Sequence, residues 1–243
     1  MSSKTKTPDR PIFFKFQKTS IWTLKNQMVT VSVGTGEEKK DFQVHKEIIT
    51  RYHVSIFGKI EMEKPGSKGV FEEDTETFVG LLEWAYHGRF LDSANKIDIL
   101  WKLHFFADKN ELVRLLDVSM NKIVLFYKNP KSPSFPTLEQ IQSGYANTKE
   151  GSGARIFLAS CYLSISNVNN KKFDTKITCS DEDLAETAVK TDGLMLDVFK
   201  FTRKKDRPYN MEWDPRLANL CLYHLHAIGE KCPGWRESLP KSN

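Results

Sequence analysis

Cysteine and long apolar runs are both scarce in this chain. Its 243 residues include four cysteines, too few for a disulfide-stapled scaffold, which favours a reducing compartment. No apolar run approaches the roughly 18 residues that span a bilayer, and no apolar stretch of signal-peptide length follows the first basic residues. We therefore expect an intracellular protein, in the cytoplasm or the nucleus, with no membrane partner.

Sequence motifs of catalysis are missing as well. The chain has no nucleophile elbow, no metal-hydrolase His-Glu pair and no internal repeat. Gly34-Thr35-Gly36 lacks the third glycine and the Lys-Ser/Thr continuation of a phosphate-binding loop, so it indicates a plain turn. These absences favour a protein that is not an enzyme and has no cofactor.

The net positive charge is small and lies at one end of the chain. The formal net charge is +5; residues 1–27 hold six basic side chains and one acidic one, whereas residues 28–243 hold 30 of each. Nucleic-acid binding by the neutral body is therefore disfavoured. The basic arm carries Phe13, Phe14, Phe16 and Trp22, which leaves two interpretations: a solvated tail, or a nucleic-acid contact of a DNA-associated regulator.

Alternating and helical patterns follow this arm. Residues 28–33 and 41–45 alternate apolar and polar side chains around a glycine-containing turn, which predicts a hairpin. Residues 46–62 indicate two short helices or one broken helix, and residues 64–74 a turn and a short strand. Asp74 or Thr75 then begins a helix that stops at Gly88, and further helices are expected at about 97–108 and 111–128.

Prolines punctuate residues 129–136 and predict a linker. Thr137 and Gln140 resemble a capping box that opens a helix to about residue 147. Further helical segments are expected at about 153–165, 181–203 and 214–228. The chain is thus predicted to be an α+β unit followed by a mostly helical extension.

The order of these elements over residues 28–128 resembles a BTB/POZ domain. The segments VTVSVG and FQVHKEII are similar to the opening of that family, FEEDTETFVGLLEWAYHGRF to its short strand and following helix, and LHFFADKNELVRLLDVSMNKI to its later helices. The segments FPTLEQIQSGYANTKEGSGAR (135–155) and CLYHLHAIGEKC (221–232) resemble the regions that follow the BTB domain in filamentous-fungal BTB proteins.

This resemblance implies a division of the chain and a function. The expected parts are a basic arm at 1–21, a BTB/POZ domain at 22–128, a linker at 129–136, a helical extension at 137–235 and a tail at 236–243. The family implies protein–protein interaction through a homodimer, as a scaffold that recruits an unidentified protein through the extension, or as a ubiquitin-ligase adaptor on a cullin scaffold. It also implies a structural role for His45, which would orient the first helix.

The sharpest chemical pattern is C-x2-H-x-H-x5-C near the C-terminus. Cys221, His224, His226 and Cys232 are ligand types that zinc prefers. In the helix expected at 214–228, Cys221 and His224 share an apolar face while His226 points away. Core packing with an exposed His226 is therefore favoured over a zinc site, and a Cys221–Cys232 disulfide is the third alternative. No metal site is assigned from the sequence.

The remaining histidines and cysteines are expected to be structural. His104 lies on an apolar helix face, where a hydrogen-bonded core histidine is the usual outcome. Cys161 and Cys179 are isolated, and such cysteines mostly pack as small hydrophobic residues.

Overall fold

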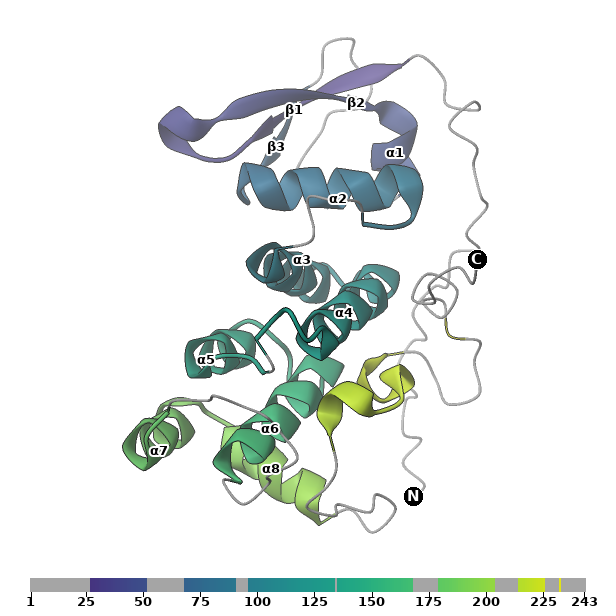
Figure 1. Cartoon of the computed structure of the whole chain (residues 1–243). Coiled ribbons are helices and arrows are strands. Elements are labelled where there is room, and N and C mark those ends of the chain that lie inside the picture. The colour runs from purple at the N-terminus through teal and green to yellow at the C-terminus, as the bar shows by residue number, and fades with distance from the viewer. Residues whose placement is uncertain are drawn as a thin grey trace, which may run out of the picture.

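The computed structural model describes residues 27–51, 68–90, 96–133, 135–167, 179–203, 214–225 and 232. A three-stranded sheet lies at one end of the molecule, and the helices follow one another away from it (Figure 1). The basic arm at 1–21 and the second half of the helical segment expected at 46–62 lie outside the described residues. Within the described ranges, no helix is long and apolar enough to cross a membrane.

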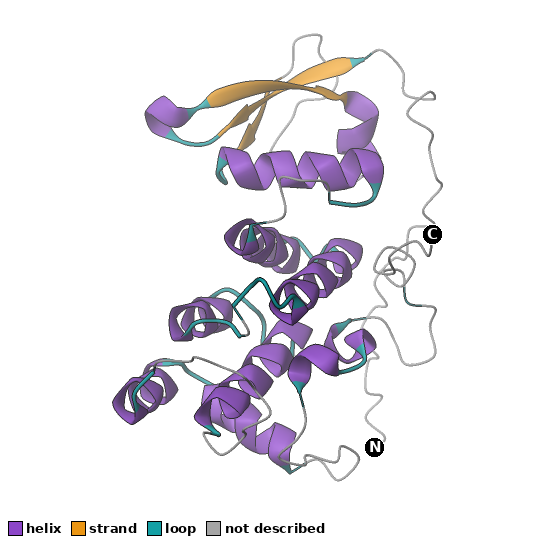
Figure 2. Ribbon diagram, in the orientation of Figure 1, coloured by secondary structure: helices purple, strands orange, loops and turns teal. Residues whose placement is uncertain are grey.

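The sheet is mixed and has the order β2-β1-β3 (Figure 2). Strand β1 (Met28–Val33) pairs antiparallel with β2 (Lys40–His45), and the predicted hairpin is confirmed. Strand β3 (Lys68–Phe71) pairs parallel with β1. Val29, Val31 and Val33 are buried, as the alternation in β1 predicts for a strand with one face on the core.

Two helices follow from the sheet. Helix α1 (Lys46–Arg51) directly follows β2, and α2 (Thr75–His87) packs below the sheet. Asp74 caps α2, because its Oδ1 accepts a 2.8 Å hydrogen bond from the Thr77 backbone N–H. The helix ends at Gly88, whose φ of 68° favours glycine. The Phe78 ring of α2 lies 4.9 Å from the Phe71 ring of β3, which fixes α2 against the sheet.

Helices α3 (Ile97–Lys109) and α4 (Val113–Lys128) form the centre of the molecule. Helix α4 begins two residues later than expected, after Glu111, which has a φ of 56°. Trp101 Nε1 donates to Tyr127 Oη (3.3 Å), and Tyr127 Oη donates to Gln140 Oε1 (2.8 Å). This chain of hydrogen bonds links α3 and α4 to the next helix.

The predicted linker does not separate two bodies. Phe135 is buried, and the buried apolar side chains from Val29 to Tyr223 form one contiguous core. Helix α5 (Leu138–Ala146) opens with the predicted capping box of Thr137 and Gln140, and α6 (Gly153–Ser166) follows. The predicted helical extension therefore packs directly on the unit that contains the sheet.

Arg155 explains part of the sequence pattern between α5 and α6. Its Nη2 donates to the carbonyl oxygens of Tyr145 (2.9 Å) and Thr148 (2.8 Å), which lie at and just beyond the end of α5. Its guanidinium carbon also lies 4.9 Å from the centre of the Tyr145 ring. One arginine thus caps α5, stacks on its last turn and holds the start of α6 beside it.

The prediction of a single helix at 181–203 is wrong. The segment forms α7 (Asp181–Lys190) and α8 (Leu194–Thr202), separated at Gly193, which has a φ of 80°. This left-handed conformation cannot continue a right-handed helix. After the break the two helices run in different directions (Figure 1). Leu184 on α7 and Leu194 and Val198 on α8 are all buried.

The prediction of a helix at 214–228 is also wrong. Within residues 214–225 the chain forms two short 3₁₀ turns, η5 (Pro215–Leu217) and η6 (Leu220–Tyr223). The Asp214 side chain accepts a hydrogen bond from the backbone N–H of Arg216, and the Asn219 side chain accepts one from the backbone N–H of Cys221. Each donor lies two residues after its acceptor. Such local side-chain bonds compete with the hydrogen bonds of a continuous helix.

His104 is the core histidine that the pattern predicts. It is buried in α3, and its Nδ1 lies 2.9 Å from Ser119 Oγ of α4. Burial lowers the pKa of His104 to about 4, because the charged imidazolium would lose its hydration. The folded protein therefore holds this side chain neutral.

Acid should destabilise the protein through His104. The unfolded chain binds this proton near pH 6.5 and the folded protein only near pH 4. The stability that comes from keeping His104 neutral is therefore complete above pH 6.5 and is lost as the pH falls toward 4. From about pH 7.5 to about pH 5 the loss is about 2 kcal/mol, measured by urea denaturation. His104→Asn should remove this component, whereas His87→Asn should keep it; equal pH dependence in all three proteins would contradict the assignment.

Gly153 is where α6 meets the C-terminal segment. A Cβ atom built at Gly153 lies 1.9 Å from the carbonyl oxygen of Tyr223, so a larger residue must push two backbones apart. At Gly144 of α5 the nearest atom is Leu158 Cδ1 at 2.2 Å, the end of a side chain that can change its rotamer.

Gly153→Ala should therefore lower the free energy of unfolding by at least about 2 kcal/mol. Gly144→Ala, the matched control, should cost distinctly less because Leu158 can move. Urea denaturation of both variants measures the difference. A smaller loss for Gly153→Ala than for Gly144→Ala would show that the close contact with Tyr223 is not required.

Candidate functional site

Three of the four residues of the Cys/His pattern converge in the structure. Ligand atoms of Cys221, His224 and Cys232 all lie within 4.8 Å of one another, and Cys232 Sγ is 3.2 Å from His224 Nδ1. Two thiols and an imidazole are donors typical of a zinc site. We refer to these three residues as the Cys/His cluster; His226 lies outside the described residues.

The 3₁₀ turn η6 is what brings the cluster together. Cys221 lies within η6, and His224 follows it in an extended conformation with φ −97° and ψ 158°. Cys221 is exposed and His224 is 9% exposed. The expected packing of both residues on a buried helix face is therefore wrong for Cys221, because the helix that would have buried it does not form.

His224 is oriented by a residue that the sequence pattern does not reveal. Its Nε2 lies 2.7 Å from Oδ1 of Asn121, a buried residue of α4. Because that oxygen can only accept a hydrogen bond, Nε2 carries the proton and the lone pair is on Nδ1. The lone pair thus faces Cys232. The two partners are 103 positions apart in the chain, so no local signal predicts the contact.

Asp117 contributes a second long-range contact from α4. Its Oδ1 accepts a 3.1 Å hydrogen bond from the backbone N–H of Leu225, and Asp117 is fully buried. Partial desolvation of the Cys221 thiol raises its pKa, and the hydrogen bond with Cys232 and the negative charge of Asp117 raise it further. A bound cation would have the opposite effect, because metal ligation requires and stabilises the thiolate.

All four cysteines are free thiols in the structure. The disulfide between Cys221 and Cys232, an alternative from the sequence, is thus not formed. Cys161 is buried within α6, in agreement with its expected role as a small hydrophobic residue, and Cys179 is half-buried before α7.

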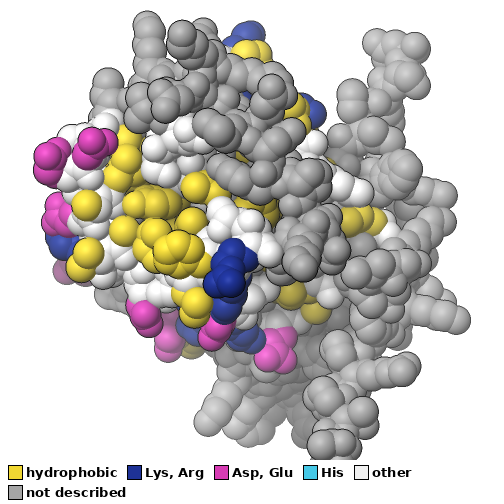
Figure 3. Space-filling view, turned by 90° about the horizontal axis from the view of Figure 1, so that it is seen from below, with side chains coloured by type: hydrophobic (Ala, Val, Ile, Leu, Met, Phe, Trp, Pro, Cys, Tyr) yellow, Lys and Arg dark blue, Asp and Glu magenta, His cyan; other side chains and the backbone are white. Residues whose placement is uncertain are grey.

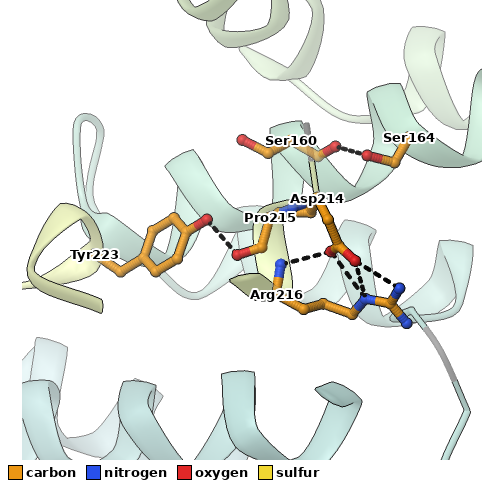
Figure 4. A network of polar contacts seen from close by, with 6 residues as sticks. All are labelled: Ser160, Ser164, Asp214, Pro215, Arg216 and Tyr223. Atoms are coloured by element: carbon orange, nitrogen blue, oxygen red, sulfur yellow. Dashed lines mark hydrogen bonds and ion pairs between the residues drawn. The ribbon is translucent and has the colours of Figure 1, made fainter. Parts of the chain in front are cut away.

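The segment that carries Cys221 and His224 is fixed by contacts within itself, drawn in Figure 4, and by contacts with α6 and the predicted linker. Asp214 and Arg216 form an ion pair of 2.7 Å, and the Arg216 guanidinium lies 4.6 Å from the centre of the Phe135 ring. Tyr223 Oη donates to the carbonyl oxygen of Pro215 (2.8 Å), and its ring lies 5.3 Å from that of Phe157. These contacts hold the cluster in place without a helix.

A second candidate site is an apolar surface on α7 and α8. Val189 is 86% exposed, Leu196 54% and Phe199 58%. Hydrophobic side chains gather on the face on which these helices lie, seen from below in Figure 3. We call these three residues the α7–α8 face. In the α8 segment LMLDVFKF, Asp197 and Lys200 share one side, and apolar residues occupy the rest of the helix surface, which is more than one buried stripe requires.

His45 has the structural contacts that the resemblance implies. Its backbone N–H donates to Tyr86 Oη (3.0 Å), and its Nδ1 lies 2.8 Å from the same oxygen. Tyr86 belongs to α2, so this pair ties the junction of β2 and α1 to the helix below the sheet.

The chain matches no model of a known protein family, and no curated protein or solved structure matches it. Functional inference therefore starts from the fold, the α7–α8 face and the Cys/His cluster.

Proposed function

We propose that this protein is a protein–protein interaction module. In this proposal residues 28–128 form a BTB/POZ-like unit that homodimerises, and the helical extension recruits another protein through the α7–α8 face. The single observation that carries the proposal is the exposure of Val189 on α7 and of Leu196 and Phe199 on α8, the helix that follows it in the chain.

The α7–α8 face has the composition of a docking surface. Clustered exposed apolar side chains are uncommon on monomeric proteins and mark interaction sites. Phenylalanine is enriched in the buried centre of interfaces. Covering Phe199 and Leu196 would stabilise a complex by about 1–3 kcal/mol per side chain.

Two lysines near this face are paired with acidic residues of the chain. Lys190 forms an ion pair with Glu186, and Lys200 Nζ lies 3.1 Å from Glu150 and 3.6 Å from Asp197. Neutralised charges contribute little attraction to a charged ligand. We therefore infer a partner with an apolar contact surface rather than a strongly acidic or basic one.

The element order supports the BTB/POZ-like part of the proposal. A hairpin, a helix, a short strand and three helices follow one another in the described residues from β1 to α4. This is the order that the resemblance implies. The small sheet made from a hairpin and a later strand also agrees with it.

Homodimerisation predicts a particle of about twice the 28.0 kDa mass of the chain. Light scattering of the purified full-length protein at micromolar concentration measures it. Leu196→Asp with Phe199→Asp should leave the dimer mass unchanged, because dimerisation is assigned to residues 28–128. A strict monomer would overturn the dimer but not partner binding by the extension.

Partner recruitment is tested by affinity purification from the source cell followed by mass spectrometry. The double variant Leu196→Asp and Phe199→Asp should recover at least ten-fold less of the partner protein than the original chain does, because it places two charges in the contact. Leu217→Asp, which changes a 66% exposed residue of η5, should retain it. Equal retention by all three proteins would contradict the role of the α7–α8 face.

Retention of a cullin N-terminal region would distinguish a ubiquitin-ligase adaptor from a scaffold.

A further inference from the structure

We propose that Cys221, His224 and Cys232 bind a zinc ion that fastens the C-terminal segment to α4. The donor set is two thiolates and one neutral imidazole, which selects zinc over the oxygen-preferring magnesium and calcium ions. The three donors come from one short stretch of chain, and one of them is oriented by a buried residue of α4. This inference is independent of the proposed interaction function.

The distances fit a tetrahedral ion with small side-chain movements. Zinc–sulfur bonds of about 2.3 Å and zinc–nitrogen bonds of about 2.0 Å place tetrahedral donors roughly 3.5–3.8 Å apart. In the structure the donor atoms lie within 4.8 Å of one another, and the Cys232 Sγ to His224 Nδ1 distance is 3.2 Å. Binding would then require a shift of the exposed Cys221 side chain and a slight lengthening of the Cys232 Sγ to His224 Nδ1 distance.

Asn121 supplies the outer contact that zinc-bound histidines require. Ligating histidines donate their second ring N–H to a carboxylate, a carbonyl or water, which fixes the tautomer and the ring plane. The 2.7 Å contact from His224 Nε2 to Asn121 Oδ1 has this form. Asn121 is buried, so the imidazole presents Nδ1 to the two sulfur atoms before any metal arrives.

Core packing does not account for the positions of the two thiols of the cluster. Cys221 is exposed and Cys232 half-buried, so neither thiol is placed by the hydrophobic core, and neither forms a disulfide. Zinc binding displaces the two thiol protons, and the two thiolates then balance the charge of the ion. The three described ligands occupy three tetrahedral positions, and water or another side chain completes the shell.

The test uses the full-length chain purified without chelator under reducing conditions. We expect one zinc ion per chain by inductively coupled plasma mass spectrometry, and a thiolate-to-metal charge-transfer band after substitution with Co²⁺. Cys221→Ser, His224→Ala and Cys232→Ser should each lower zinc affinity by at least 100-fold. Cys179→Ser is the matched control, because it removes a half-buried thiol outside the cluster and should keep the ion.

Asn121 provides a second test that leaves all three ligands in place. Asn121→Ala should weaken zinc binding about 10–100-fold, whereas Asn121→Asp, which keeps an acceptor for His224, should restore most of the affinity. Competition with a chromophoric chelator measures these changes, and circular dichroism confirms that each variant is folded. This pair decides the question even if a ligand variant fails to fold.

Thermal melting separates a site from adventitious binding. Zinc should raise the Tm of the original chain and of Cys179→Ser, and should leave that of Cys221→Ser with Cys232→Ser unchanged. Zinc content in the reduced original chain no higher than in this double variant would overturn the proposal. So would rapid formation of a Cys221–Cys232 disulfide that zinc does not prevent.

Discussion

Helix α4 buries an aspartate, a serine and an asparagine, and much of the structure depends on satisfying their hydrogen bonds. Asp117, Ser119 and Asn121 are all buried. Their partners come from two directions: α3 supplies His104, and the C-terminal segment supplies the Leu225 backbone and His224. Because a buried polar group without a partner costs about 1–3 kcal/mol, the loss of either neighbour would destabilise the packing of α4.

The proline-rich segment 129–136 that follows α4 differs in composition from its neighbours, but the hydrophobic core continues on both sides of it. Tyr127 of α4 donates to Gln140 of α5, and Phe135 between them is buried beneath Arg216. The prolines of 129–136 end one helix and turn the chain, yet the side chains on either side share one core. Proline spacing predicts where a helix stops, but it carries no information about whether the next one packs on it.

The sequence predicted best those elements whose signals are local. The valine alternation of β1, the Asp74 cap and the Thr137 capping box each involve residues at most a few positions apart, and each is confirmed. The errors at 181–203 and 214–228 have a different origin. There apolar spacing suggested continuous helices, while Gly193, Asp214 and Asn219 ended or diverted them through conformations that hydrophobic periodicity does not record.

The same limit explains the candidate site. The spacing of Cys221, His224 and Cys232 predicts the residue types of the site, but a helix through them would keep these side chains from converging, and the 3₁₀ turn η6 replaces that helix. Asn121, which orients His224, lies 103 residues earlier, and no pattern of neighbours could have pointed to it. Residue type was therefore predictable at this site, whereas geometry depended on a distant contact.

The contacts between α4 and residues 224–225 span more than 100 positions of the chain, and this separation sets an order of events during synthesis. When the ribosome has produced α4, the residues that satisfy Asp117 and Asn121 have not yet been translated. Closing so long a loop is slow relative to forming local helices. The surface of α4 that carries Asp117 and Asn121 therefore lacks these partners until residues 224–225, within about the last tenth of the chain, are translated.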